Sequence, residues 1–149
     1  MDDRVQFHVR GPFRVTEPGG ADITPKGSKL RGLLLLLLTS PTGKRARIWL
    51  QDKLWSDRGR AQGAASLRQA VFQTRRAFGT YKDLLTADRL EVALALGRIR
   101  ICEDGSGEFA EGLDVRDEEF ERWLRIERSR RSAAEADLAA PVLFVSNAQ

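Results

Sequence analysis

Six consecutive leucines, residues 33–38, limit the folds that this chain can adopt. Ser28, which can cap a helix, lies shortly before the run, and Pro41 and Gly43 end it. A membrane span needs roughly 20 apolar residues, far more than this run offers. We therefore predict a central helix that is apolar nearly all round and buried among other elements.

A small antiparallel sheet is expected before this helix. Residues 5–15 alternate between apolar and polar side chains around Gly11 and Pro12, which predicts one or two half-buried strands with a turn between them. Residues 17–20 are a strong turn signal, and residues 21–24 are expected to form a short returning strand. His8 lies in the alternating run, which favours an ordinary strand position over a metal ligand.

Residues 63–79 carry the strongest functional signal, and we predict that they form a helix that enters a DNA groove. In an α-helix successive residues are rotated by about 100° around the axis. One narrow stripe of this helix then contains Leu67, Val71, Thr74 and Phe78, and Ala70 and Ala77 lie at its flank. The opposite side, with Arg75 at its margin, contains Ala65, Arg68, Gln69, Phe72 and Arg76. Gly79 follows the last stripe residue, as is typical of a helix C-terminus.

Two features distinguish this face from the solvated basic side of an ordinary amphipathic helix. Surface helices usually mix glutamate with lysine and arginine, because opposite charges four residues apart attract one another, whereas this face has no carboxylate. The exposed Phe72 also needs a partner, and a thymine methyl group is one. Both features favour contact with DNA.

Charge is distributed unevenly along the 149 residues. The net charge is +4, but residues 26–76 contain twelve basic and two acidic side chains, and residues 103–149 contain six basic and twelve acidic ones. A basic block centred on one helix is typical of a protein that binds a polyanion. The acidic C-terminal part should not touch that polyanion.

A second helix is expected just before the basic one. Residues 47–55 contain Leu50 and Leu54 at a spacing of four, and a polar loop follows from Ser56 to Gln62. Two helices joined by a loop, the second of them basic, indicate a helix-turn-helix with a longer connection than usual. The basic turn or short strand before these helices supplies candidate phosphate contacts, which we expect, with Arg75, to be Lys44, Arg45 and Arg47.

A hairpin is predicted after the basic helix. Residues 84–94 alternate on both sides of a turn at residues 87–89, which is typical of the wing of a winged helix. Arg89 at its tip could reach a phosphate or a minor groove, although an exposed turn arginine without a partner gives the same pattern. Residues 98–102 could add a strand, with Cys102 as a small buried hydrophobe, since no histidine lies nearby to activate it.

The acidic, glycine-rich residues 103–108 predict a boundary between a DNA-binding domain, residues 1–102, and a C-terminal segment, residues 103–149. Asp117 can cap a helix in which one face contains Phe120, Trp123, Leu124 and Glu127. A single helix cannot bury this stripe alone, so it must dock on the first domain or on another partner. Residues 141–145 are predicted to be a strand-like apolar piece, and we expect the chain to be a fragment of something longer.

The residue inventory argues against an enzyme. One cysteine and one histidine exclude an internal disulfide and a zinc site built from several cysteines. No phosphate-binding loop and no nucleophile with a base is present. We predict no catalytic residue, metal or cofactor.

The first residues, Met-Asp-Asp-Arg, lack an apolar secretory core, which favours a cytoplasmic location and no membrane association.

Four runs in this order indicate a family: residues 30–38, Leu54-Trp55-Ser56-Asp57, Ser66-Leu67-Arg68-Gln69-Ala70 and Arg75-Arg76-Ala77-Phe78-Gly79. Together they resemble the DNA-binding domain of the antibiotic regulatory (SARP) family of bacterial transcription factors. Residues 109–112 and 120–128 resemble the start of the bacterial transcriptional activation domain that follows in this family, whose later helical repeats are absent here. The resemblance implies an α+β winged helix-turn-helix of the OmpR/PhoB type, with the third helix in the major groove.

The sequence therefore predicts a sequence-specific regulator of transcription that binds double-stranded DNA. The resemblance implies a contact with RNA polymerase through the loop from Ser56 to Gln62, and the prediction allows a homodimer on DNA. Two alternatives stay open. One is a protein-interaction module whose basic face binds an acidic partner or its own tail, and the other is the DNA-binding front end of a longer signalling protein.

Overall fold

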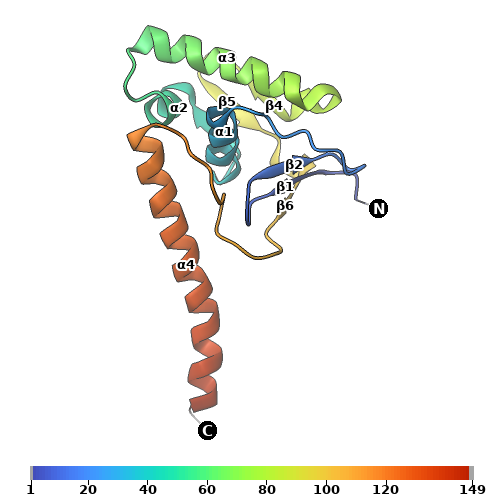
Figure 1. Ribbon diagram of the computed structural model, residues 1–149, viewed down its shortest axis with the longest axis vertical. Coiled ribbons are helices and arrows are strands. Elements are labelled where there is room, and N and C mark those ends of the chain that lie inside the picture. Colours follow the sequence, from blue (N-terminus) through green and yellow to red (C-terminus); the bar gives the residue numbers. More distant parts are fainter. Residues whose placement is uncertain (1, 148–149) are drawn as a thin grey trace.

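The computed structural model describes the backbone of residues 2–147 and the side chains of residues 2–138 (Figure 1). It is a winged helix with a long C-terminal helix, so the predicted α+β fold class is confirmed. In chain order the elements are β1 (Val5–His8), β2 (Arg14–Thr16), α1 (Ser28–Leu38), β3 (Lys44–Ala46), α2 (Arg47–Leu54), α3 (Arg60–Phe78), η1 (Gly79–Leu84), β4 (Leu85–Ala87), β5 (Glu91–Leu94), η2 (Leu96–Arg98), β6 (Ile99–Cys102) and α4 (Glu118–Asn147).

The N-terminal sheet has the order β2-β1-β6 and is mixed, not purely antiparallel as predicted. β1 runs antiparallel to β2 but parallel to β6, where Val5 lies opposite Ile99. Residues 21–24 form no strand and contribute a single bridge between Thr16 and Asp22. The reason is that the hydroxyl of Thr24, at 2.8 Å, accepts the N–H of Val15 that a returning strand would need.

The six consecutive leucines of α1, residues 33–38, are all buried, as predicted, and form the centre of the hydrophobic core. Ser28 does not cap this helix: it is the first helical residue, and Gly27 is the N-cap without a side-chain hydrogen bond. Gly32 faces α4, because a Cβ at this position would lie 3.0 Å from the ring of Phe120. The missing side chain of Gly32 leaves room for the ring of Phe120 against α1.

The helix-turn-helix consists of α2 and α3. Helix α3 begins at Arg60, three residues before the predicted start, so the predicted loop from Ser56 to Gln62 is shorter and its last three residues form the first turn of α3. Gly79 ends the helix at a φ of 60°, as expected for a glycine at this position. The predicted wing exists, and β3 extends it to a sheet of order β3-β5-β4.

Helix α4 docks on the winged helix through its first turns. Asp117 caps it, as predicted, by accepting the N–H groups of Glu119 and Phe120 at 2.9 and 3.3 Å. Phe120 and Leu124 are buried in the same core as the leucines of α1. From α2 the helix runs away from α3 (Figure 1). The strand-like piece predicted at residues 141–145 is wrong, because these residues continue the helix of an alanine-rich segment.

Candidate nucleic-acid interface

The two faces of α3 separate as the periodicity predicted. The inner face is buried and consists of Gly63, Leu67, Ala70, Val71, Thr74 and Phe78. Ala77, expected at the flank of this stripe, is exposed. The outer face is exposed and presents Ala65, Arg68, Gln69, Phe72 and Arg76. The side of α3 that points to solvent is therefore the side with cations, an amide and one aromatic ring.

This outer face combines positive charge with an apolar surface. Helix α3 contains four arginines and no acidic residue along its 19 residues. The ring of Phe72 is 58 % exposed, which is a large exposed area for an aromatic side chain without a partner. A helix of this length spans about 28 Å, enough to lie along a stretch of major groove.

The hairpin β4–β5 lies beside α3 and ends in an exposed turn (Figure 1). The carboxylate of Asp88 holds this turn by accepting the N–H groups of Leu90 and Glu91, both at 2.8 Å, and these bonds lower the pKa of Asp88. Arg89 is exposed at the tip, and Leu90 beside it is 73 % exposed. The hairpin beside α3 thus ends in an exposed cation.

Arg47 connects the start of α2 to the tip of this wing. Its guanidinium donates to the carbonyl of Asp88 at 3.0 Å, and its backbone N–H donates to the carbonyl of Leu90 at 2.9 Å. Part of the hydrogen-bonding capacity of this predicted phosphate contact is therefore used within the chain. Arg47 is half-buried, so the rest of the guanidinium still reaches solvent.

A cationic cluster next to the wing sheet was only partly found from the sequence. Lys44 is exposed, and the guanidinium of Arg45 lies 4.2 Å above the ring of Trp49. The ammonium group of Lys53 lies 5.5 Å from the centre of the same ring. Trp49 and Lys53 lie four residues apart in α2, and this helical spacing is the signal that would have placed Lys53 beside the ring. Arg45 lies in β3, so no helical spacing predicts its contact with Trp49.

Arg75 differs from its neighbour Arg76. Its guanidinium binds the carbonyl oxygens of Lys82, at 3.1 Å, and Leu85, and forms an ion pair of 3.4 Å with Asp83. Arg76 is exposed and has no such partner within the described part of the chain. The arginine at the margin of the outer face thus binds groups of the same chain, whereas its neighbour on that face points to solvent.

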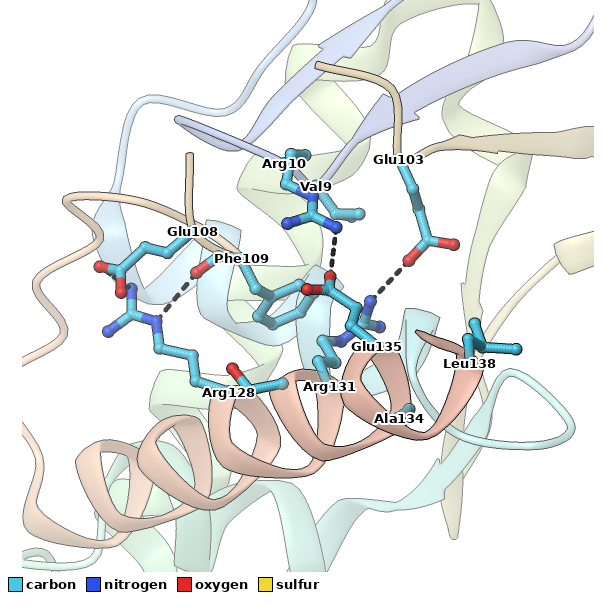
Figure 2. Close-up of a pocket in the computed structure, with 11 residues that line it drawn as sticks. Val9, Arg10, Glu103, Glu108, Phe109, Arg128, Arg131, Ala134, Glu135 and Leu138 are labelled. Atoms are coloured by element: carbon cyan, nitrogen blue, oxygen red, sulfur yellow. Dashed lines mark hydrogen bonds and ion pairs between the residues drawn. The ribbon is translucent and has the colours of Figure 1, made fainter. Parts of the chain in front are cut away.

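A cleft of about 400 Å³ lies between the N-terminal sheet and α4 (Figure 2). Its arginines point towards carboxylates of the same chain: Arg131 pairs with Glu103 at 2.6 Å, and Arg128 with Glu108 at 3.3 Å. Arg10 pairs in the same way with a glutamate of α4, Glu135. The cleft is therefore a charged contact that fastens α4 to the sheet, and it leaves no uncompensated cation among the described residues that line it.

Three further features bear on other kinds of site. Among residues 2–138, whose side chains are described, no group of three or more His, Cys, Asp or Glu side chains could hold a metal ion. Cys102 is half-buried instead of buried, and this burial raises the pKa of its thiol. No helix in the described range is long and apolar enough to cross a membrane.

The fold is similar to that of a solved structure, Mycobacterium tuberculosis EmbR in complex with a low-affinity phosphopeptide. The match has a TM-score of 0.52 and 22 % sequence identity, and it covers 61 % of this chain but 25 % of that chain. No protein-family model and no curated protein sequence matches the chain. Over about 61 % of its length the chain is thus similar in fold to EmbR, and it corresponds to about a quarter of that protein.

Proposed function

We propose that the protein regulates transcription by binding specific sequences of double-stranded DNA, with α3 in the major groove. The observation that carries the proposal is the exposed, acid-free outer face of α3 beside a wing with an exposed arginine at its tip. A polyanion is the partner that such a face attracts, and a helix beside a wing is the shape that enters a groove. A cytoplasmic, bacterial setting belongs to the same proposal.

The residues of the outer face are proposed to contact base edges. Arg68, Gln69 and Arg76 carry planar groups that can bond two atoms of a guanine or adenine edge, each worth about 1–3 kcal/mol of discrimination. Phe72 and Ala65 are apolar and suit the methyl group of thymine. This combination of polar and apolar groups on one exposed face supports sequence-specific binding over a general attraction to negative charge.

A second set of cations is proposed to contact phosphates and so to orient the protein on the duplex. It comprises Lys44, Arg45 and Arg47 around the start of α2 and Arg89 on the wing. The exposure of Lys44 and Arg89 supports this role most directly, because their charged groups are in solvent. Arg47 would contact phosphates with the N–H groups that its bond to Asp88 leaves over, and Arg45 with the guanidinium that lies over Trp49.

Two protein partners belong to the proposal. One is RNA polymerase, which would contact the segment from Ser56 to Gln62. The exposure of this whole segment supports an interaction, since a loop and a first helical turn are both accessible there. The other is a second copy of the chain, bound as a homodimer on adjacent DNA sites.

The experiment that tests the proposal is a binding selection from random duplex DNA, repeated over a series of salt concentrations. We expect one motif, or a direct repeat of it, to be enriched, with an affinity that falls steeply as salt rises. Salt-sensitive binding without an enriched motif would contradict sequence recognition and leave a general polyanion binder. A folded protein that binds no DNA at low salt would favour the protein-interaction module instead.

A further inference from the structure

Arg75 connects the recognition helix to the segment that leads into the wing. Its Nη1 atom donates to the carbonyl oxygen of Lys82, in η1, at 3.1 Å and to that of Leu85, the first residue of β4. Its Nη2 atom lies 3.4 Å from a carboxylate oxygen of Asp83. One side chain of α3 thus binds two residues of η1 and the first residue of the wing.

The carbonyl of Leu85 has no other strand to bind. β4 is an outer strand of the β3-β5-β4 sheet, and Leu94, which lies opposite Leu85, donates its N–H to Gly43 at 2.8 Å. On this outer edge the carbonyl of Leu85 therefore accepts its hydrogen bond from the guanidinium of Arg75. The connection itself is a short 3₁₀ helix, a geometry with weaker hydrogen bonds than an α-helix, so it needs such support.

We infer that Arg75 is a positioning residue for DNA binding and does not act by contacting a phosphate. It holds the wing at a fixed place beside α3, so that Arg89 and the outer face of α3 can meet one duplex together. The inference rests on the proposed function. Its physical basis is preorganisation: a wing that is already in place loses less conformational entropy on binding.

A positioning residue and a phosphate contact differ in how their removal combines with the removal of Arg89. If Arg75 acts by positioning the wing, its effect on affinity depends on Arg89, the residue that the wing presents. Removing Arg75 should then weaken binding of the native chain but change little in a chain that already lacks Arg89. Two independent phosphate contacts would instead add their effects.

The test measures the Kd for the selected duplex, over a salt series, for R75A, R75K, R89A and the double variant R75A/R89A. We expect R75A to weaken binding about three- to tenfold, the range of one or two lost hydrogen bonds, and the double variant to bind like R89A. R75K keeps the charge but loses the planar fork, so it should lose most of what R75A loses. It also serves if the alanine variant unfolds.

Arg76 provides the matched control, because it is the adjacent arginine and is exposed. R76A should weaken binding in the R89A background as much as in the native chain. Additive effects of R75A and R89A, or native affinity in R75K, would overturn the inference and restore Arg75 as a phosphate contact.

A measurement without DNA separates this inference from the proposed function. Amide hydrogen exchange of residues 85–94 in the free protein should be faster in R75A than in R76A, because the outer edge of β4 is released. Equal exchange in both variants would overturn the positioning role even if the native chain binds DNA. If the native chain binds no DNA but exchange is faster in R75A, the proposed function is overturned, whereas the role of Arg75 in holding the wing is retained.

Discussion

The carboxylate of Asp117 binds Ser56, 61 residues earlier in the chain. It accepts the backbone N–H of Ser56 at 2.8 Å and its hydroxyl at 2.8 and 2.9 Å. The same carboxylate caps α4, and Asp117 is only 6 % exposed. The loop between α2 and α3 and the first turn of α4 therefore share one buried carboxyl group, so neither can move without breaking bonds of the other.

Removing this carboxylate should destabilise the whole chain. We expect Asp117→Ala to lower the free energy of unfolding by about 2–4 kcal/mol, since it removes a helix cap and strands the donors of Ser56. Ser56→Ala removes the hydroxyl bond alone and should lower it by about 1 kcal/mol. Urea denaturation measures both values. Asp114→Ala, an exposed aspartate nearby, is the control, and an equal effect of Asp114→Ala and Asp117→Ala would contradict the shared role.

Gly43 should not tolerate a side chain. It has a φ of 75°, and a Cβ there would lie 2.4 Å from the carbonyl oxygen of Leu94. We expect Gly43→Ala to lower the free energy of unfolding by about 2 kcal/mol or more, because strain and a backbone clash combine. Gly97→Ala is the matched control, since a Cβ there has open space. The melting temperatures of both variants measure this difference. A Gly43→Ala protein as stable as Gly97→Ala would contradict the prediction and show that the turn before β3 can relax.

Stability should fall when the medium becomes mildly acidic. Burial, with help from the charge of Arg14, holds the pKa of His8 below its ordinary value of 6.5. The unfolded chain therefore takes up a proton more readily than the folded one, so the free energy of unfolding decreases as the pH falls below 6.5. His8 is the single histidine of the chain, so no other histidine contributes to the change in stability over this pH range. Urea midpoints from pH 7 to pH 5 should decline more in the native chain than in His8→Gln, and parallel curves would exclude His8 as the cause.

Base contacts and phosphate contacts should respond differently to substitution. Arg68→Ala should relax specificity at one or two positions of the selected motif, because its loss removes a bidentate base contact. Lys44→Ala should weaken binding to selected and random duplexes alike and reduce the salt slope by about one. Competition binding with both duplexes measures the difference. Equal losses on selected and random DNA for Arg68→Ala would reject its assignment to a base edge.

Local patterns determined a large part of this fold. The leucine run required a buried helix, and the 3.6-residue period of α3 fixed which of its side chains are buried and which are exposed. The hairpin followed from alternation around a turn. These features depend on residues within a few turns or strands of one another, so the sequence by itself specifies them.

Tertiary structure decided the rest, because it depends on contacts between distant residues. No local pattern predicts that β6 runs parallel to β1, or that Asp117 binds Ser56 as well as capping α4. The helical period places Arg75 at the margin of the outer face, but only the folded chain brings the carbonyl groups of Lys82 and Leu85 to it. A periodic pattern shows which way a side chain points, whereas its partner depends on how the whole chain packs.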